Sequence, residues 1–312
     1  MYHIASKLLL YLILPALLLS CTSKEGDMSP AEYADHIEEW DSVRLQRLKS
    51  PTGWVNLAGL FWLEEGANSI GAAGTNDIVF PRGPEEIGVM MRNGNDVNFI
   101  PSGEVNVKAD GEDISGSIKI FGEERDAELL TVDSLGFFII QRGERIGIRL
   151  RDYIHPRLDD LQHIDRYSPD QDWIIKAIFI EPDEEITIMV PDVLGEIREE
   201  EAPGILEFEF DGEKYRLYPT GSRERLFIIF ADDTNALETY GAGRFLSGGA
   251  VDSEGYVYLD FNKAYNPPCA FSPYATCPLP PRENFLPFGV TAGEKAVARL
   301  AKSKKAEFTW DK

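Results

Sequence analysis

Apolar side chains recur at helical spacing in one segment near the start of the chain, between Ser29 and Leu48. They fall on one face, at Tyr33, Ile37, Trp40, Val43 or Arg44, and Leu48. Ser29 is a residue type that caps helix N-termini, and Pro30 suits the first helical position because the N–H that it lacks would have no partner there. The pattern predicts a short N-terminal helix over residues 29–48.

The rest of the chain shows a different pattern, in which short apolar runs are separated by turn residues. Several runs alternate apolar and polar positions, as half-buried antiparallel strands do. Asp211–Gly212 stands between two such runs and is a favoured hairpin turn. The clearest predicted strands are Val97–Ile100, Ser117–Phe121, Phe137–Gln141, Ile146–Leu150, Trp173–Phe179, Glu185–Val190, Leu206–Phe210, Lys214–Leu217, Leu226–Phe230 and Tyr256–Phe261.

These patterns predict a mainly β fold made of two packed antiparallel β units, each sandwich-like or barrel-like. The charged segment Asp152–Tyr167 is the best position for a boundary. We therefore assign residues 31–160 to the N-terminal helix with a first β unit, and residues 161–312 to a second β unit. Long alternation of helices and strands is missing from the pattern, which argues against a doubly wound nucleotide-binding fold.

The first twenty residues have the composition of an export signal. Lys7 supplies a positive charge, and the apolar run after it is about twelve residues long, against the roughly 20 that a transmembrane helix needs. Leu18–Cys21 resembles a lipobox, in which the cysteine receives the lipid. We expect a signal peptide over residues 1–20, a lipid anchor at Cys21 and a polar tether over residues 21–30; a transmembrane anchor is the alternative.

We therefore expect a lipid-anchored protein of the cell envelope, at the outer membrane, on its periplasmic or its surface-exposed face; the sequence does not decide between the two faces. Its formal net charge of −22 argues against binding to nucleic acid, whose phosphates would repel such a surface. The same charge argues against a protein that rests on an anionic membrane face. The sequence makes no prediction for the oligomeric state.

Two cysteines remain once Cys21 is assigned to lipid, namely Cys269 and Cys277. In an oxidising compartment they most simply form a disulfide. A zinc site is the weaker alternative, because no C-x-x-C motif or neighbouring histidine accompanies them. A catalytic thiol is weaker still, because no histidine follows Cys269. We expect no metal and no cofactor, since Walker, H-E-x-x-H and G-x-S-x-G motifs are all missing.

A dense block of motifs fills the C-terminal part of the chain. It comprises TYGAGRFL at residues 239–246, LDFNKAYNPPCAF at 259–271, CPLPP at 277–281, Asn284, and AGEK at 292–295. These motifs closely resemble the DUF1684 family of bacterial and archaeal proteins, whose function is unknown. The resemblance therefore implies a family without implying a reaction.

The block also holds the polar residues that are the best candidates for a functional site. Arginine offers a planar fork to a carboxylate, a phosphate or a sugar oxygen, and aspartate and asparagine orient hydroxyl groups. The alternative is structural, because Asn and Asp satisfy backbone groups in loops and an arginine pairs with a nearby aspartate. The candidates are Asp232, Thr234, Tyr240, Arg244, Asp260, Asn262, Asn266 and Asn284, joined by Arg149 and Glu294.

Two functions from different classes remain open. The first is a non-catalytic envelope lipoprotein that binds a small polar ligand, a glycan or a protein partner through the C-terminal block, with Tyr240, Arg244, Asn262, Asn266, Asn284 and Arg149 as ligand-binding residues. The second is a hydrolase that uses Asp260 or Asp232 as base and Arg244 as anion stabiliser, with or without a metal ion. We favour the first.

The lipid anchor is testable by labelling cells with palmitate. The wild-type protein is expected to incorporate the label and the Cys21→Ala variant to lose it, because Cys21 ends the lipobox-like sequence. Equal labelling of the two proteins would exclude the anchor.

Overall fold

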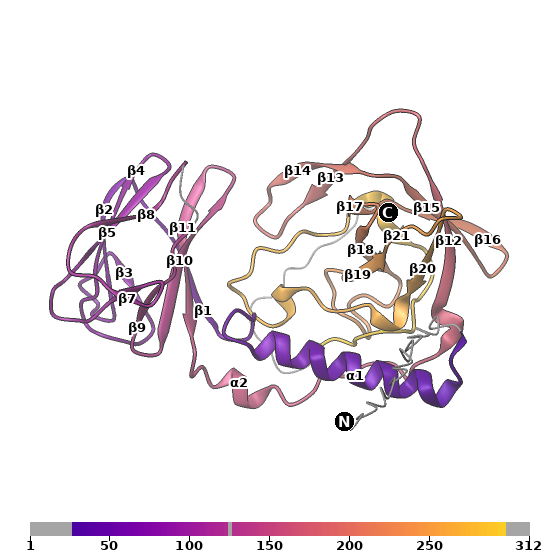
Figure 1. Cartoon of the computed structure of the whole chain (residues 1–312), viewed down its shortest axis with the longest axis horizontal. Helices are drawn as coiled ribbons and strands as arrows, with labels where there is room; N and C mark the ends of the chain where they lie inside the picture. The colour runs from indigo at the N-terminus through magenta and orange to yellow at the C-terminus, as the bar shows by residue number, and fades with distance from the viewer. Residues whose placement is uncertain (1–26, 124–126, 298–312) are drawn as a thin grey trace, which may run out of the picture.

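The structure, a computed structural model, describes residues 27–123 and 127–297. It consists of two β units side by side, with one long helix running along the second (Figure 1). The predicted mainly β fold, with antiparallel sheets and a helix near the N-terminus, is confirmed. Each strand predicted above coincides with an observed strand whose ends differ by no more than two residues.

Helix α1 spans Pro30–Lys49, one residue further along than predicted. Ser29 and Glu32 cap its start reciprocally: the Glu32 N–H donates to the Ser29 hydroxyl (3.4 Å), and the Ser29 N–H donates to the Glu32 carboxylate (2.9 Å). Ser50 ends the helix with an extended backbone. Local sequence therefore sets both ends of this helix.

The first unit is a sandwich of two sheets, with strand orders β1-β11-β10-β9-β6-β7 and β3-β2-β4-β5-β8. Alternate side chains of each strand fill the space between the sheets, as Ile146, Ile148 and Leu150 of β11 do. The strands are β1 (Leu57–Trp62), β2 (Gly66–Gly71), β3 (Ile78–Val79), β4 (Gly88–Asn93), β5 (Asp96–Pro101), β6 (Lys108–Ala109), β7 (Glu112–Asp113), β8 (Ile118–Phe121), β9 (Leu130–Val132), β10 (Leu135–Arg142) and β11 (Arg145–Asp152).

The second unit follows the short helix α2 (Arg157–Asp160) and packs two sheets, β16-β15-β12-β20 and β17-β18-β19, around a core that includes Phe179, Phe230 and Phe261. Strand β21 extends the second sheet by pairing in parallel with β18. The strands are β12 (Ile174–Ile180), β13 (Ile186–Pro191), β14 (Ile197–Ala202), β15 (Ile205–Phe210), β16 (Glu213–Leu217), β17 (Thr220–Ser222), β18 (Arg225–Asp232), β19 (Arg244–Gly249), β20 (Tyr256–Asp260) and β21 (Phe285–Leu286). Short 3-10 helices lie at Gln171–Trp173 (η2), Phe261–Lys263 (η3), Pro268–Ala270 (η4) and Arg282–Asn284 (η5).

The strand pairs β15–β16 and β13–β14 of the second unit each form a hairpin. Asp211 and Gly212 make the predicted turn between β15 and β16, and their positive φ angles of 54° and 81° are those of a favoured two-residue turn. Strands β13 and β14 form a separate hairpin. Ile188 and Val190 of this hairpin pack on Ile229, which lies on the face of β18 that points away from the main core.

Helix α1 belongs structurally with the second unit, although residues 31–160 were expected to form one group with the first. Its Tyr33 donates to the Asp260 carboxylate at 2.7 Å. Arg44 pairs with Glu294 (3.0 Å) and stands 4.6 Å above the ring of Tyr265. The helix therefore lies along the motif block of the second unit, as Figure 1 shows, and the first β unit is inserted between α1 and that block.

The loop between Cys269 and Cys277 joins the two units. These cysteines lie at disulfide distance, with Cα atoms 6.1 Å apart, in agreement with the expected disulfide. Ala275 and Cys277 pack against Leu57 at the start of β1. The loop therefore covers the face of the first unit's six-stranded sheet that points away from the sandwich core.

The expected signal peptide and Cys21 lie outside the described residues, as does most of the tether. Across residues 27–123 and 127–297, none of the helices combines the length and the apolar character that a membrane span requires.

The contact between α1 and the motif block can be tested with Arg44→Met. This change leaves the Glu294 carboxylate buried without its cation, so we expect a loss of about 3 kcal/mol in the free energy of unfolding, measured in urea. Arg47→Met is the matched control, because Arg47 is exposed on the same helix, and we expect a change within about 0.5 kcal/mol. Similar losses in both variants would contradict this account of α1.

Candidate functional site

Most of the predicted site residues lie inside the second unit, where the motif block folds against the end of the described chain. Arg244 opens β19 opposite Phe230, and Asp232 ends the neighbouring strand β18. Both side chains are fully buried, and Arg244 Nη2 lies 2.9 Å from Asp232 Oδ2. Arg244 therefore pairs with an aspartate, as the structural alternative expects, and both side chains are shielded from solvent.

This ion pair holds the segment 290–294. The Arg244 guanidinium donates to the carbonyls of Val290 (2.9 Å) and Ala292 (2.5 Å). Asp232 Oδ1 accepts from the backbone N–H of Val290 at 3.1 Å and from the Thr234 N–H at 2.9 Å. The pair therefore acts as a clamp that binds backbone.

Asp260 lies at the end of β20 and is also buried. Its Oδ1 accepts from the Tyr33 hydroxyl at 2.7 Å and from the Asn262 N–H at 3.1 Å, and its Oδ2 lies 3.5 Å from Lys263 Nζ. The carboxylate thus caps η3 and anchors the N-terminal half of α1. It is placed to tie two segments together.

Two of the three asparagines, Asn262 and Asn284, bridge backbone groups that no strand partner satisfies. Asn262 exchanges hydrogen bonds with the N–H (3.0 Å) and carbonyl (2.8 Å) of Asp170. Asn284 does the same with Tyr218, at 2.7 and 2.9 Å. Asn266 donates from its side chain to the Lys295 carbonyl at 2.8 Å. Each is at least 99% buried. The amides of Asn262 and Asn284 satisfy backbone groups in place of a β ladder, whereas the side-chain oxygen of Asn266 has no hydrogen-bond partner in the described chain.

The Glu294 carboxylate contacts both the motif block and helix α1. Its carboxylate accepts from the Asn266 N–H at 2.7 Å and from Arg44 at 3.0 Å. Burial raises the pKa of Glu294, and the Arg44 charge opposes that rise. Tyr240 is half-buried against Leu48 and Phe271, and burial raises the pKa of its hydroxyl.

The structure therefore brings Asp232 and Arg244 into direct contact and places Asp260 with Tyr33 and Asn262. Asn266, Glu294 and Arg44 form a third group, and the segment 290–295 connects this group with the Arg244–Asp232 pair. Arg44 and Tyr33 were missed as partners. The only signal for Arg44 was a basic residue on the otherwise apolar face of the predicted helix.

Arg149 stands apart from the other candidates, because it lies in the first unit on β11. Its side chain points away from the sandwich core, toward the loop 269–277, and is 4% exposed. Nη2 donates to the Thr276 hydroxyl at 3.3 Å, and the guanidinium lies 5.6 Å from the centre of the Trp54 ring. Arg142, at the end of β10, donates to the same hydroxyl from Nε at 2.8 Å. Two guanidinium groups thus converge on one oxygen atom.

The neighbouring arginines pair with a carboxylate or donate to an amide or backbone carbonyl oxygen, whereas Arg149 does neither in the described part of the chain. Arg145 pairs with Glu196 (3.1 Å), Arg151 donates to Asn56 Oδ1 (2.8 Å), and Arg157 donates to two backbone carbonyls. Within the described chain, Arg149 has no carboxylate partner, and its buried Nε has no acceptor. Burial, together with the charges of Arg142 and Arg151, lowers the pKa of Arg149 to about 10.

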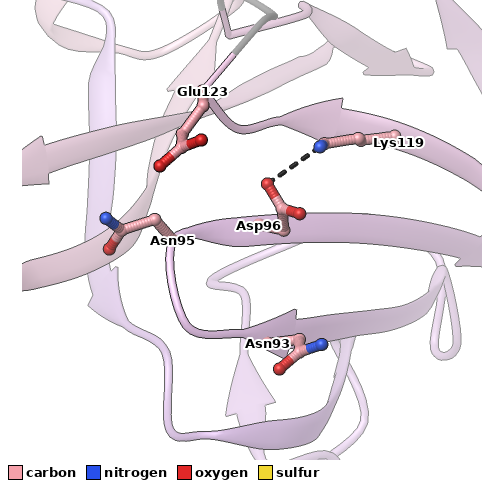
Figure 2. A pocket seen from close by; sticks show the side chains of 5 residues that line it. All are labelled: Asn93, Asn95, Asp96, Lys119 and Glu123. Atoms are coloured by element: carbon pink, nitrogen blue, oxygen red, sulfur yellow. Dashed lines mark ion pairs between the residues drawn. The ribbon is translucent and has the colours of Figure 1, made fainter.

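Neither of two hollows on the molecule is lined by Arg142, Arg149 or Thr276. Figure 2 shows the larger one, of about 360 Å³, at the β4–β5 turn of the first unit. Its lining is polar, and Asp96 there is paired with Lys119 at 2.9 Å. Its remaining side chains are those of Asn93, Asn95 and Glu123. The second hollow, of about 170 Å³, lies beside the β13–β14 hairpin.

The described residues offer no cluster of side chains suited to bind a metal ion. Among the residues that the structure describes, no group of three or more His, Cys, Asp and Glu side chains is placed to hold one. The two buried carboxylates of Asp232 and Asp260 are already engaged by Arg244 and Tyr33.

Comparison with known proteins supports the resemblance seen in the motifs. Residues 159–295 match the model of the DUF1684 family, described as a protein of unknown function, so the expected resemblance is confirmed for the second unit. A solution NMR structure of an uncharacterized protein of Haloarcula marismortui is 27% identical; the match covers 46% of this chain and 82% of that one, with a TM-score of 0.38. None of the curated proteins matches the chain.

The structural role of the Arg244–Asp232 pair is testable by substitution. Arg244→Met and Asp232→Asn each leave one partner buried and unpaired, so we expect each to lower the free energy of unfolding by about 3–5 kcal/mol in denaturant titrations. The exposed pair Arg223–Glu181 provides the control, and Arg223→Met is expected to change stability by less than about 1 kcal/mol. Unchanged stability in both core variants would instead indicate a ligand site.

Proposed function

We propose that this protein is a lipid-anchored protein of the cell envelope that binds a small polar ligand through an anionic group, without catalysing a reaction. The anion is held by Arg142 and Arg149, where the loop 269–277 of the motif block covers the first unit. The single observation that carries this proposal is the buried Arg149 guanidinium, which no carboxylate of the described chain neutralises.

The energetic argument begins with the cost of burying an unpaired charge, which is on the order of several kcal/mol. The chain has 53 acidic against 31 basic residues, so carboxylates are plentiful. Nearby arginines form ion pairs with carboxylates: Arg145 pairs with Glu196, and Arg82 pairs with Asp152 at 3.2 Å. A carboxylate or phosphate from outside the chain would neutralise Arg149 in the same way.

The geometry also suits recognition. Arg142 and Arg149 approach Thr276 from two strands of one sheet, so an anion beside that hydroxyl would meet two guanidinium groups and one O–H donor. Trp54 forms a rigid wall under Arg149. The motif block contributes by fixing Thr276 in a loop that the cysteine pair closes. This gives the block a supporting role in binding, with Arg149 as the contact residue.

The hydrolase alternative has less support. A general base must lie within hydrogen-bond reach of its substrate. The Asp232 carboxylate is engaged by Arg244, and the Asp260 carboxylate accepts from the Tyr33 hydroxyl. Arg244 directs its donors to backbone carbonyls, so it has little left for a developing anion.

The envelope setting rests on sequence features. The apolar run before Cys21 ends in a lipobox-like motif, and the cysteine pair Cys269–Cys277 suits an oxidising compartment. Helix α1 begins at Pro30, so only a short tether would separate the anchor from the folded part. The net charge of −22 would keep the folded part away from anionic headgroups.

Binding can be tested with the full chain and simple probes. Sodium glucuronate and inorganic phosphate are expected to raise the melting temperature, and glucose and matched sodium chloride are not, because Arg149 requires an anion. Arg149→Gln is expected to weaken glucuronate binding at least about tenfold by calorimetry. It should leave stability unchanged or raise it, because it removes an unpaired buried charge.

The control variant is Arg223→Gln, an exposed arginine far from the site in sequence, which should bind as the wild type does. A glucuronate shift that survives in Arg149→Gln, or an equal shift from glucose, would refute the proposal.

A further inference from the structure

The second hollow is lined by Pro278, two residues after the Thr276 that Arg142 and Arg149 contact. It lies between the β13–β14 hairpin and strand β18 and has a volume of about 170 Å³. Its floor is apolar, and its mouth carries one cation, one carboxylate and one hydroxyl. The floor residues are Val190, Phe227, Ile229 and Pro278, and the mouth residues are Arg198, Glu200 and Thr220. Small-molecule sites have this composition of apolar walls with a few polar groups.

One short segment connects this cavity with Arg149. Thr276 binds the two guanidinium groups, and Pro278, two residues later, lines the cavity. The segment is extended, because Pro278 bridges Asp192 and the Cys277 carbonyl accepts from the Val193 N–H at 3.1 Å. In an extended chain, residues i and i+2 point to the same side and lie roughly 7 Å apart. The arginine site and the cavity therefore lie on the same side of this segment.

A second observation links the two places. The charge of Arg198, at the mouth of the cavity, lowers the pKa of Arg142, after the larger effect of burial. Arg198 therefore lies close enough to Arg142 for their charges to act on each other. In the described chain it makes no ion pair of its own. Arg142 therefore lies near Arg198 at the cavity, and also near the carboxylates of Asp192 and Glu196.

We propose that the cavity beside Pro278 holds the apolar body of the ligand whose anionic group Arg142 and Arg149 bind, so that the ligand is a small amphipathic carboxylate. This inference rests on the function proposed above. The cavity accommodates about six groups the size of a water molecule or a methylene. A short straight-chain carboxylate satisfies both parts of the site, whereas a free sugar acid leaves the apolar floor uncovered.

The test is a series of straight-chain carboxylates from acetate to decanoate, titrated into the full chain by calorimetry. Each methylene that enters the cavity is expected to increase affinity about three- to fourfold. The gain should stop near hexanoate or octanoate, where the cavity is filled. Affinity that does not depend on chain length, in a protein that binds acetate and phosphate, would overturn this inference alone.

Two variants separate the anion site from the cavity. Thr220→Trp fills the mouth of the cavity and should abolish the gain with chain length while leaving acetate binding intact. Glu199→Trp is the matched control, since Glu199 is exposed on the opposite face of β14 from Glu200, and should retain the gain. Arg149→Gln should weaken the whole series. If no member of the series and no other anion binds the wild type, the proposed function fails, and this inference with it.

Discussion

The buried ion pair between Arg244 and Asp232 is the constraint on which the arrangement of the second unit depends. A buried arginine requires an anion and several acceptors, and here Asp232 supplies the first and the carbonyls of Val290 and Ala292 supply the others. Satisfying the guanidinium therefore fixes the path of the segment 290–294. That path delivers Glu294 to Arg44, and Arg44 in turn holds α1 against the motif block.

Local features of the fold could be predicted from the sequence, because each is encoded within a few neighbouring residues. The stripe from Tyr33 to Leu48 specified α1, and Asp211–Gly212 specified the β15–β16 turn. The unit on which α1 packs could not be predicted in this way. Its key contact joins Arg44 to Glu294, 250 residues apart, and one arginine on an apolar face carries no information about its partner.

The candidate site was predictable only in part, for a related reason. Asp232, Arg244, Asp260 and the three asparagines were recognised as a group, and the structure places Asp232 against Arg244 and Asp260 against Asn262. Sequence alone does not distinguish an asparagine that binds a ligand from one that replaces a β ladder, as Asn284 does for Tyr218. Arg149 differs from these residues because no carboxylate of the described chain neutralises its charge. An unpaired buried charge is visible only once the neighbours from distant segments, Thr276 among them, are in place.

The insertion of the first β unit between α1 and the motif block has a consequence for the order in which the chain assembles. Helix α1 is among the first segments to be synthesised, yet its binding surface includes Asn266 and Glu294, near the end of the described residues. The first unit contains its own core and can close early. The second unit cannot be finished before the segment 290–295 has been synthesised, because α1 docks on that segment. Contacts of such long range form slowly, so a nascent chain that ends before Glu294 would lack a finished second core.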